Sequence, residues 1–170
     1  MNYFDVFELP LQLSIDKVAL KKKFFALSRQ HHPDYFAQEG AERQQASLET
    51  SALLNKAYKT FSRQDETIRY VLTLKGLLEE NEKYDLPPAF LMEMMELNET
   101  LEAAAFDEGE RAAFMQQVVQ IESRLYEPVQ AVVENYKEGV TLESDLLLVK
   151  DYYFKKKYIE RLKQQLAEKS

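Results

Sequence analysis

The chain has 170 residues, no cysteine and a formal net charge of −7. This length allows one ordinary domain or two small ones, and with 45% hydrophobic residues wholesale disorder is not expected. The missing cysteines exclude disulfides, zinc–thiolate sites and cysteine nucleophiles, and they fit a reducing cytosol. The net charge is +2 over residues 1–75, −13 over 76–148 and +4 over 149–170, which indicates separate electrostatic roles.

Nothing in the chain points to a membrane. The first eight residues lack a basic stretch and hold acids where a signal peptide would be apolar. No apolar run approaches the roughly 20 residues that span a bilayer. We therefore expect a soluble, cytoplasmic protein with no membrane partner, and the acidic balance argues against a nucleic-acid partner.

Helix formers dominate the N-terminal part, and no alternating strand pattern occurs, so the sequence predicts an all-α fold. Ser14 is the expected N-cap of the second helix. Pro33 disfavours helical geometry at His32 and should end that helix, while Gly76 suits the end of the fourth. The expected helices cover about 3–9, 14–31, 41–61 and 64–75.

The C-terminal part begins after an acidic and then proline-rich stretch that is typical of a linker, 76–87. Helices over about 88–105, 108–137 and 142–168 follow, and their short connections predict an antiparallel three-helix bundle. Asp107 with Glu110 resembles a capping box, and Thr141 is the expected cap of the last helix. Pro128 should kink or interrupt the middle helix.

The tripeptide His32-Pro33-Asp34 follows a basic amphipathic helix. Proline stiffens the loop, which can present an imidazole and a carboxylate together, but from three letters alone a helix stop with two polar residues is the simpler interpretation. The core stripe of the preceding helix comprises Leu20, Phe24, Leu27 and His31. Its basic side chains are Lys17, Lys21, Lys22, Lys23 and Arg29.

Catalytic and metal-binding interpretations of this loop are weak. His32 and Asp34 could form an acid–base pair, but no third group, nucleophile motif or glycine-rich loop accompanies them. His31 and His32 are the only histidines, and no cysteine can complete a metal site with them. We therefore expect no enzymatic activity, no cofactor and no metal. From the residues alone, the basic helix is open to two interpretations: a solvated face or a phosphate-binding surface.

The helix over 88–105 has two apolar faces. One face, expected to form the bundle core, comprises Phe90, Met94, Leu97, Leu101 and Ala104. The other comprises Leu91, Met92 and Met95, mixed with Glu96, Glu99 and Glu102. An exposed apolar patch with polar neighbours is typical of a partner site, and methionine suits adaptable contacts. The alternatives are that the last helix or a second copy of the chain covers the patch.

Residues 1–75 contain, in order, a short aromatic helix, a basic helix, the His-Pro-Asp loop and an antiparallel third helix. This order resembles a J-domain, the module that stimulates ATP hydrolysis by DnaK-type chaperones. The whole chain resembles the HscB family of J-proteins in iron–sulfur cluster assembly. The matching strings are Tyr3-Phe4 with Phe7, Leu9-Pro10, His32-Pro33-Asp34 with Phe36, Leu54-Asn55-Lys56-Ala57-Tyr58, Tyr70-Val71-Leu72 and Phe90-Leu91-Met92-Glu93.

This resemblance implies an L-shaped, all-α protein with a four-helix J-domain in 1–75, a linker in 76–87 and a three-helix domain in 88–170. The implied role is a co-chaperone that stimulates an HscA/DnaK-type chaperone and delivers an IscU-type scaffold to it. Chaperone binding is implied for His32, Pro33, Asp34, Lys21, Lys22, Lys23 and Arg29. Scaffold binding is implied for Leu91, Met92, Met95, Glu96, Glu99 and Phe154.

The sequence departs from the family pattern in several places. Tyr35 replaces the usual lysine after His-Pro-Asp, Ala103 stands where an acid is common, and Pro128 interrupts a helix that the family runs through. Residues 64–69 also lack the usual Pro-x-x-Arg-Ala. Three rival hypotheses stay open: a J-protein with another client, a helical interaction module without a chaperone role, and an enzyme that uses His32. For the basic side chains of the last helix, Lys155–Lys157, Arg161 and Lys163, we expect a solvated face that offsets the acids of the neighbouring helices.

Overall fold

The computed structural model describes all residues 1–170, and every regular element in it is a helix. The all-α prediction is therefore confirmed. The chain divides into two compact units, Met1–Val71 and Leu72–Ser170. The predicted domains 1–75 and 88–170 with a linker in 76–87 stay a prediction. No helix combines the length and the apolar character required to cross a membrane.

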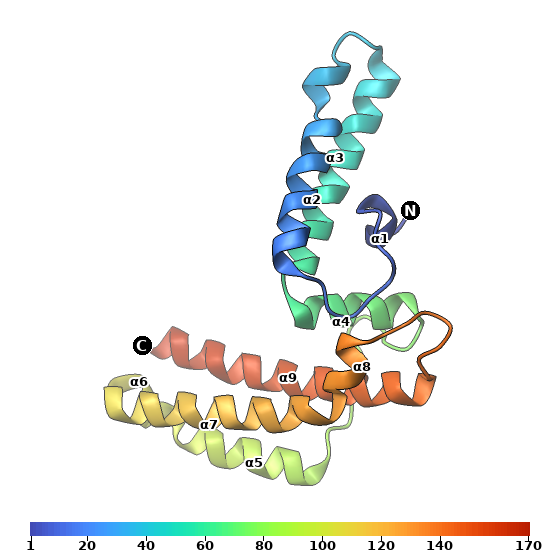
Figure 1. Cartoon of the computed structure of the whole chain (residues 1–170). Helices are drawn as coiled ribbons and strands as arrows, with labels where there is room; N and C mark the ends of the chain where they lie inside the picture. Colours follow the sequence, from blue (N-terminus) through green and yellow to red (C-terminus); the bar gives the residue numbers. More distant parts are fainter. The chain divides into compact units, whose positions relative to one another are not determined.

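The N-terminal unit is built on two long antiparallel helices that lie side by side and are joined by a loop at one end (Figure 1). Its elements are α1 (Tyr3–Val6), α2 (Lys17–Gln30), the short 3-10 helix η1 (Pro33–Phe36), α3 (Ala41–Phe61) and the start of α4 (Gln64–Leu74). Leu20 and Leu27 of α2 are buried, as are Leu54, Ala57 and Phe61 of α3. The apolar stripe predicted for α2 therefore faces α3, although Phe24 and His31 are only half-buried.

Aromatic contacts fix α1 on this helical pair. The ring of Phe4 lies 4.7 Å from that of Phe61, and Tyr3 stacks on Tyr70 at 4.3 Å between ring centroids. The Tyr70 hydroxyl also accepts a hydrogen bond of 2.9 Å from the backbone N–H of Tyr3. The aromatic residues at the N-terminus thus anchor a helix that is too short to be stable alone.

Two expected helix ends in this unit are wrong. Ser14 does not cap α2, because the carboxylate of Asp16 accepts hydrogen bonds from the N–H groups of Val18 and Ala19. A carboxylate there also interacts favourably with the helix dipole. The first helix ends at Val6, not near Leu9, because Glu8 has a positive φ of 55°. The ends of α3 agree with the prediction.

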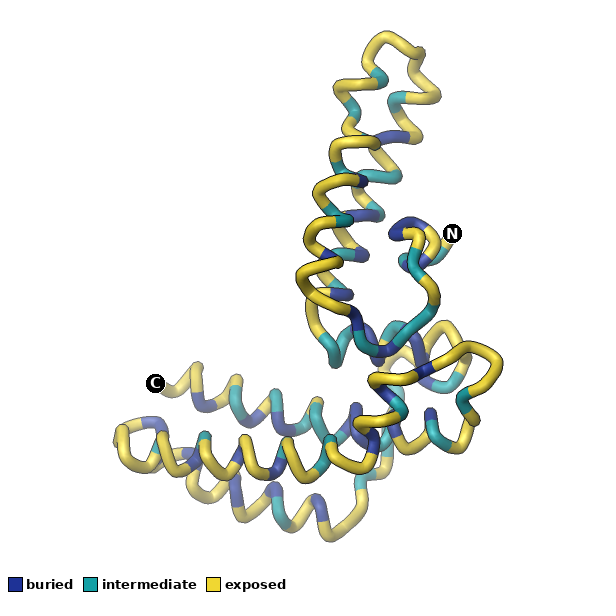
Figure 2. Tube along the Cα trace, viewed as in Figure 1, coloured by how far each residue is buried: buried dark blue, intermediate teal, exposed yellow.

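In the C-terminal unit three long helices, α5, α7 and α9, run side by side as a bundle (Figure 1). Figure 2 shows the buried residues as a repeating stripe along each helix. The core includes all five residues predicted for it, Phe90, Met94, Leu97, Leu101 and Ala104. The elements are α5 (Pro88–Glu99), α6 (Leu101–Phe106), α7 (Glu108–Tyr126), the 3-10 helix η2 (Glu127–Val129), α8 (Gln130–Glu134) and α9 (Glu143–Lys169).

The helix expected over 88–105 is in fact two helices, α5 and α6, which meet at Thr100. The Thr100 hydroxyl donates to the Leu97 carbonyl at 2.7 Å and so competes for an acceptor of the helix. Pro128 interrupts the next helix as predicted and lies in η2. Asp107 caps α7 as predicted, accepting from the N–H of Glu110.

The predicted cap at Thr141 is wrong. The N-cap of α9 is Leu142, whose side chain makes no capping bond. The Thr141 hydroxyl instead accepts from the N–H of Lys137 and closes the turn before the helix. Threonine is a suitable capping residue, but here its hydroxyl is already occupied by the hydrogen bond within the preceding turn.

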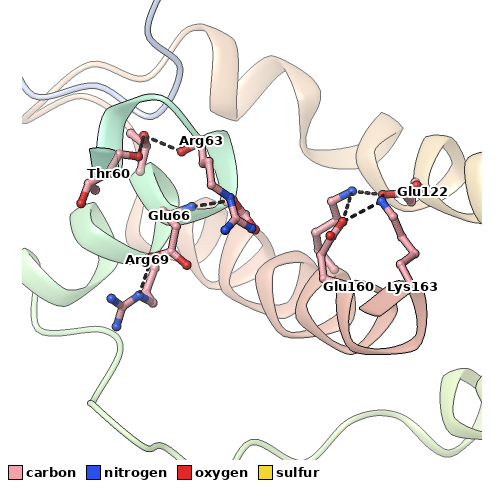
Figure 3. A network of polar contacts seen from close by, with 10 residues as sticks. Thr60, Arg63, Glu66, Arg69, Glu122, Glu160 and Lys163 are labelled. Atoms are coloured by element: carbon pink, nitrogen blue, oxygen red, sulfur yellow. Dashed lines mark hydrogen bonds and ion pairs between the residues drawn. The ribbon is translucent and has the colours of Figure 1, made fainter. Parts of the chain in front are cut away.

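Ion pairs hold α7 and α9 together (Figure 3). Lys156 and Lys163 of α9 both contact Glu122 of α7, and Lys163 also lies 2.9 Å from Glu160 on its own helix. These side chains are at most one-third exposed. The expectation that these basic side chains offset acids of a neighbouring helix is therefore confirmed for Lys156 and Lys163, although both are less exposed than a solvated face implies.

Candidate functional site

The loop between α2 and α3 presents His32 and Asp34 together. The backbone N–H of Asp34 donates to His32 Nδ1 at 3.2 Å, and a carboxylate oxygen of Asp34 lies 3.5 Å from the same nitrogen. Pro33 occupies the first position of η1, where its missing N–H costs nothing. The Ser51 hydroxyl of α3 donates to the His31 carbonyl at 3.0 Å and anchors the loop.

This anchored loop leaves its two functional side chains in solvent. The side chain of His32 is 55% exposed and that of Asp34 is 89% exposed. Because Nδ1 accepts the backbone hydrogen bond, Nε2 carries the ring's N–H. The stiff display of an imidazole beside a carboxylate, which the sequence predicted, is therefore present. Because both side chains are exposed, this display suits contact with another protein.

Three of the four basic side chains predicted to bind a chaperone are exposed: Lys21, Lys22 and Arg29. Lys23 is half-buried and its ammonium donates to the Glu8 carbonyl at 3.0 Å, so it also supports the turn after α1. Lys17, at the start of the same helix, donates to the Phe61 carbonyl at 2.7 Å, and burial lowers its pKa. The basic face available to a partner is therefore the middle and the end of α2.

Two aromatic residues beside the loop were not among the predicted site residues. Phe25 is 53% exposed and Tyr35 is 67% exposed, and both line an open groove with Arg29, His32 and Asp34. The Tyr35 ring meets the His32 ring edge-on, 6.3 Å between centroids. Two signals in the sequence point to these residues: Tyr35 stands where the family usually has lysine, and Phe25 lies outside the core stripe of α2.

On α5 the second apolar face is exposed, as predicted. Met92 is 64% and Met95 63% exposed, and Leu91 is 37% exposed. Glu96 and Glu99 are exposed beside them. We call these five residues the α5 patch. Because α9 packs on the opposite, buried side of α5, the last helix does not cover the patch.

An ion pair with α7 helps to orient this helix. Both guanidinium nitrogens of Arg124 bond to the carboxylate of Glu93, one of them at 2.9 Å. Glu93 lies in the sequence between Met92 and Met95, but its carboxylate is turned toward α7. The bidentate geometry limits rotation of α5 about its axis and so keeps the α5 patch outward.

Phe154, on α9, is only 9% exposed. Its ring stacks on Tyr84, with 4.4 Å between centroids and 4° between planes. The Tyr84 hydroxyl donates to Asp151 at 2.8 Å, and Lys150 pairs with Glu82 at 2.7 Å. The segment 82–84 is thus fastened to α9 and covers Phe154.

Tyr84 should give this contact a signature at alkaline pH. Burial of the ring and the hydrogen bond to Asp151 raise the pKa of Tyr84 from 10.0 to about 12. The unfolded chain loses this proton first, so the free energy of unfolding should fall as the pH rises from 10 to 12. Tyr84→Phe should make this fall shallower in urea titrations across that range. If the free energy of unfolding fell equally with pH in the wild type and in Tyr84→Phe, the raised pKa of Tyr84 would be contradicted.

A comparison with family models matches residues 86–167 to the HSCB C-terminal oligomerisation domain. The co-chaperone HscB homologue of Vibrio cholerae (strain M66-2) is 33% identical over 98% of this chain and 95% of its own length. The homologue of Haemophilus ducreyi is 35% identical and covers 98% of both chains.

Solved structures agree with these relatives. The structure of chaperone HscB from Vibrio cholerae has a TM-score of 0.77 at 31% identity and covers 99% of this chain and 96% of its own. The crystal structure of human co-chaperone protein HscB has a TM-score of 0.83 at 26% identity, covering 99% and 82%. Together with the helix order and the exposed His-Pro-Asp loop, these likenesses show that the chain belongs to the HscB co-chaperone family.

Proposed function

We propose that the protein stimulates the ATPase of an HscA/DnaK-type chaperone and delivers an IscU-type iron–sulfur scaffold to it in the cytoplasm. The chaperone would bind His32, Pro33 and Asp34 together with the exposed basic face of α2. The scaffold would bind the α5 patch. The observation that carries this proposal is that one chain of this family exposes both surfaces, each on a different compact unit.

The proposed mechanism is coupling by proximity. A chain that holds both proteins raises the local concentration of the scaffold at the chaperone without any new contact between the two. His32 and Asp34 act on the chaperone and catalyse nothing within this chain. No cofactor is required, because the iron–sulfur cluster is the cargo of the scaffold.

The charges on the two surfaces suit different partners. The exposed Lys21, Lys22 and Arg29 favour an acidic surface on the chaperone, whereas Glu96 and Glu99 favour a basic and apolar region on the scaffold. Opposite charges on the two surfaces speed the correct encounters and disfavour the exchanged ones. Binding at either surface should therefore weaken as salt is added.

A steady-state ATPase assay tests the whole proposal. The protein alone should raise the rate of the chaperone, the scaffold alone should raise it less, and the two together should exceed the sum of their separate effects. The excess is expected because the scaffold arrives already held beside the chaperone. Stimulation that is merely additive would contradict delivery and favour a J-protein with another client.

The remaining rivals give different results in the same assay. A helical interaction module without a chaperone role would leave the ATPase rate unchanged. An enzyme that uses His32 would convert a small molecule with no chaperone present, and His32→Gln would stop that turnover.

A further inference from the structure

A groove runs between the segment 82–86 and α9. Its polar and aromatic lining includes Lys83, Tyr84, Phe154, Lys157, Tyr158 and Arg161. Tyr84 and Phe154 form the stacked pair described above, and Tyr158 is half-buried beside them. The groove therefore has an aromatic floor and a basic rim.

The basic rim is unusual for this unit, in which 12 basic side chains face 20 acidic ones. Most of the cations on α9 are neutralised: Lys150, Lys155, Lys156 and Lys163 each pair with a carboxylate. Lys83, Lys157 and Arg161 have no carboxylate within ion-pair distance. Three unpaired cations thus line one groove of an acidic unit.

The groove also keeps its cations near the aromatic rings. The Lys157 ammonium lies 5.9 Å from the centroid of the Phe154 ring, close enough for a cation–π contact. Glu82 is the one carboxylate of the lining, and Lys150 already binds it, which lowers the pKa of that carboxyl. The net charge of the groove is therefore positive.

One aromatic contact joins the groove to the first turn of α5, where the α5 patch begins. Tyr158 meets the ring of Phe90 edge-on at 6.1 Å between centroids, and Leu91 of the patch follows Phe90 in the chain. Leu86, at the end of the groove, lies two residues before the first residue of α5. The groove therefore lies beside the end of α5 at which the patch begins.

We propose that the groove binds an acidic segment of the same scaffold protein that binds the α5 patch. Carboxylates of that segment pair with Lys83, Lys157 and Arg161, and an apolar side chain packs on the aromatic floor. This inference rests on the proposed function. The acidic patch and the basic groove then form a bipolar surface, which accepts the scaffold in one orientation only.

The bipolar surface also accounts for Phe154. A residue that is 9% exposed offers little area on an open face. As the floor of a groove, it contributes to binding only once a partner side chain enters and displaces water. Its contribution should therefore depend on the cations at the rim, which bring the segment in.

The test compares two double variants with the same change in charge. Lys157→Glu with Arg161→Glu reverses two cations of the groove, while Lys137→Glu with Lys169→Glu reverses two unpaired cations elsewhere in the unit. Isothermal titration calorimetry with an IscU-type scaffold should show affinity about tenfold weaker for the groove variant and less than about twofold weaker for the control. Circular dichroism checks that both variants fold.

A competition experiment identifies the occupant. A glutamate-rich peptide with one phenylalanine should displace the scaffold from the wild-type protein and not from the groove variant. Displacement by inorganic phosphate to the same extent would assign the groove to a free anion and overturn the proposal.

Failure of this inference is distinguishable from failure of the proposed function. If both double variants bind the scaffold equally well while alanine variants of the α5 patch do not bind, the groove proposal is wrong and the proposed function stands. If the wild-type protein does not bind the scaffold at all, both are wrong.

Discussion

His32→Gln should return the chaperone ATPase to its unstimulated rate and leave the affinity for the scaffold unchanged. Glutamine keeps a polar side chain that can accept the hydrogen bond from the Asp34 N–H, so the loop should keep its shape. It removes the imidazole that is displayed beside the Asp34 carboxylate. The measurement is the steady-state ATPase rate of the chaperone with the variant, beside calorimetry with the scaffold.

The adjacent histidine provides a matched control. His31 lies at the C-cap of α2, and its contribution to the loop is the backbone carbonyl that accepts from Ser51. His31→Gln preserves that carbonyl and should preserve stimulation. Equal stimulation by wild type and His32→Gln would exclude the J-domain role, while equal losses in both variants would point to a distorted loop.

The helices were predictable where a single local signal decides them. The start of α3 after Gly40 and the interruption at Pro128 follow from glycine and proline geometry. Capping was less predictable: Asp16 rather than Ser14 binds the first N–H groups of α2, and the Thr141 hydroxyl accepts from the Lys137 N–H before α9 begins. The break at Thr100 depends on one hydroxyl bond to Leu97, which no periodicity reveals.

The candidate sites show the same division between local and tertiary information. Helical projection predicted that Leu91, Met92 and Met95 face away from the core, because the spacing of residues along a helix determines which side each side chain occupies. Projection could not show that Tyr84 covers Phe154, since the two are 70 positions apart in the chain. The pairing of Lys156 and Lys163 with Glu122 of α7 is equally non-local, and the basic run of α9 contains both paired and unpaired cations.

Alanine at Leu91, Met92 and Met95 together should weaken scaffold binding about 100-fold. Two of these side chains are nearly two-thirds exposed, so they are free to bury apolar area against a partner. Truncation of a contact side chain at the centre of an interface costs on the order of 1 kcal/mol or more, and three such losses reach about 3 kcal/mol. Calorimetry with the scaffold measures this directly.

The same exposure means that the triple variant should fold normally. The core face of α5 is formed by Phe90, Met94 and Leu97, which are untouched. The free energy of unfolding in urea should therefore change by less than about 1 kcal/mol, as is usual for surface substitutions away from the core. Stimulation of the chaperone by the variant without scaffold should equal that of wild type, since His32 and Asp34 are intact.

A second exposed apolar set in the same unit separates specific binding from a general loss of apolar surface. Leu142, Leu147 and Leu148, at the start of α9, are 64%, 47% and 57% exposed. Alanine at these three positions removes a similar amount of apolar area from a different place. Scaffold affinity should then stay within about twofold of wild type, because no contact of the α5 patch is lost. If the scaffold still binds the α5 variant tightly and no longer binds the α9 variant, the binding surface lies at the start of α9.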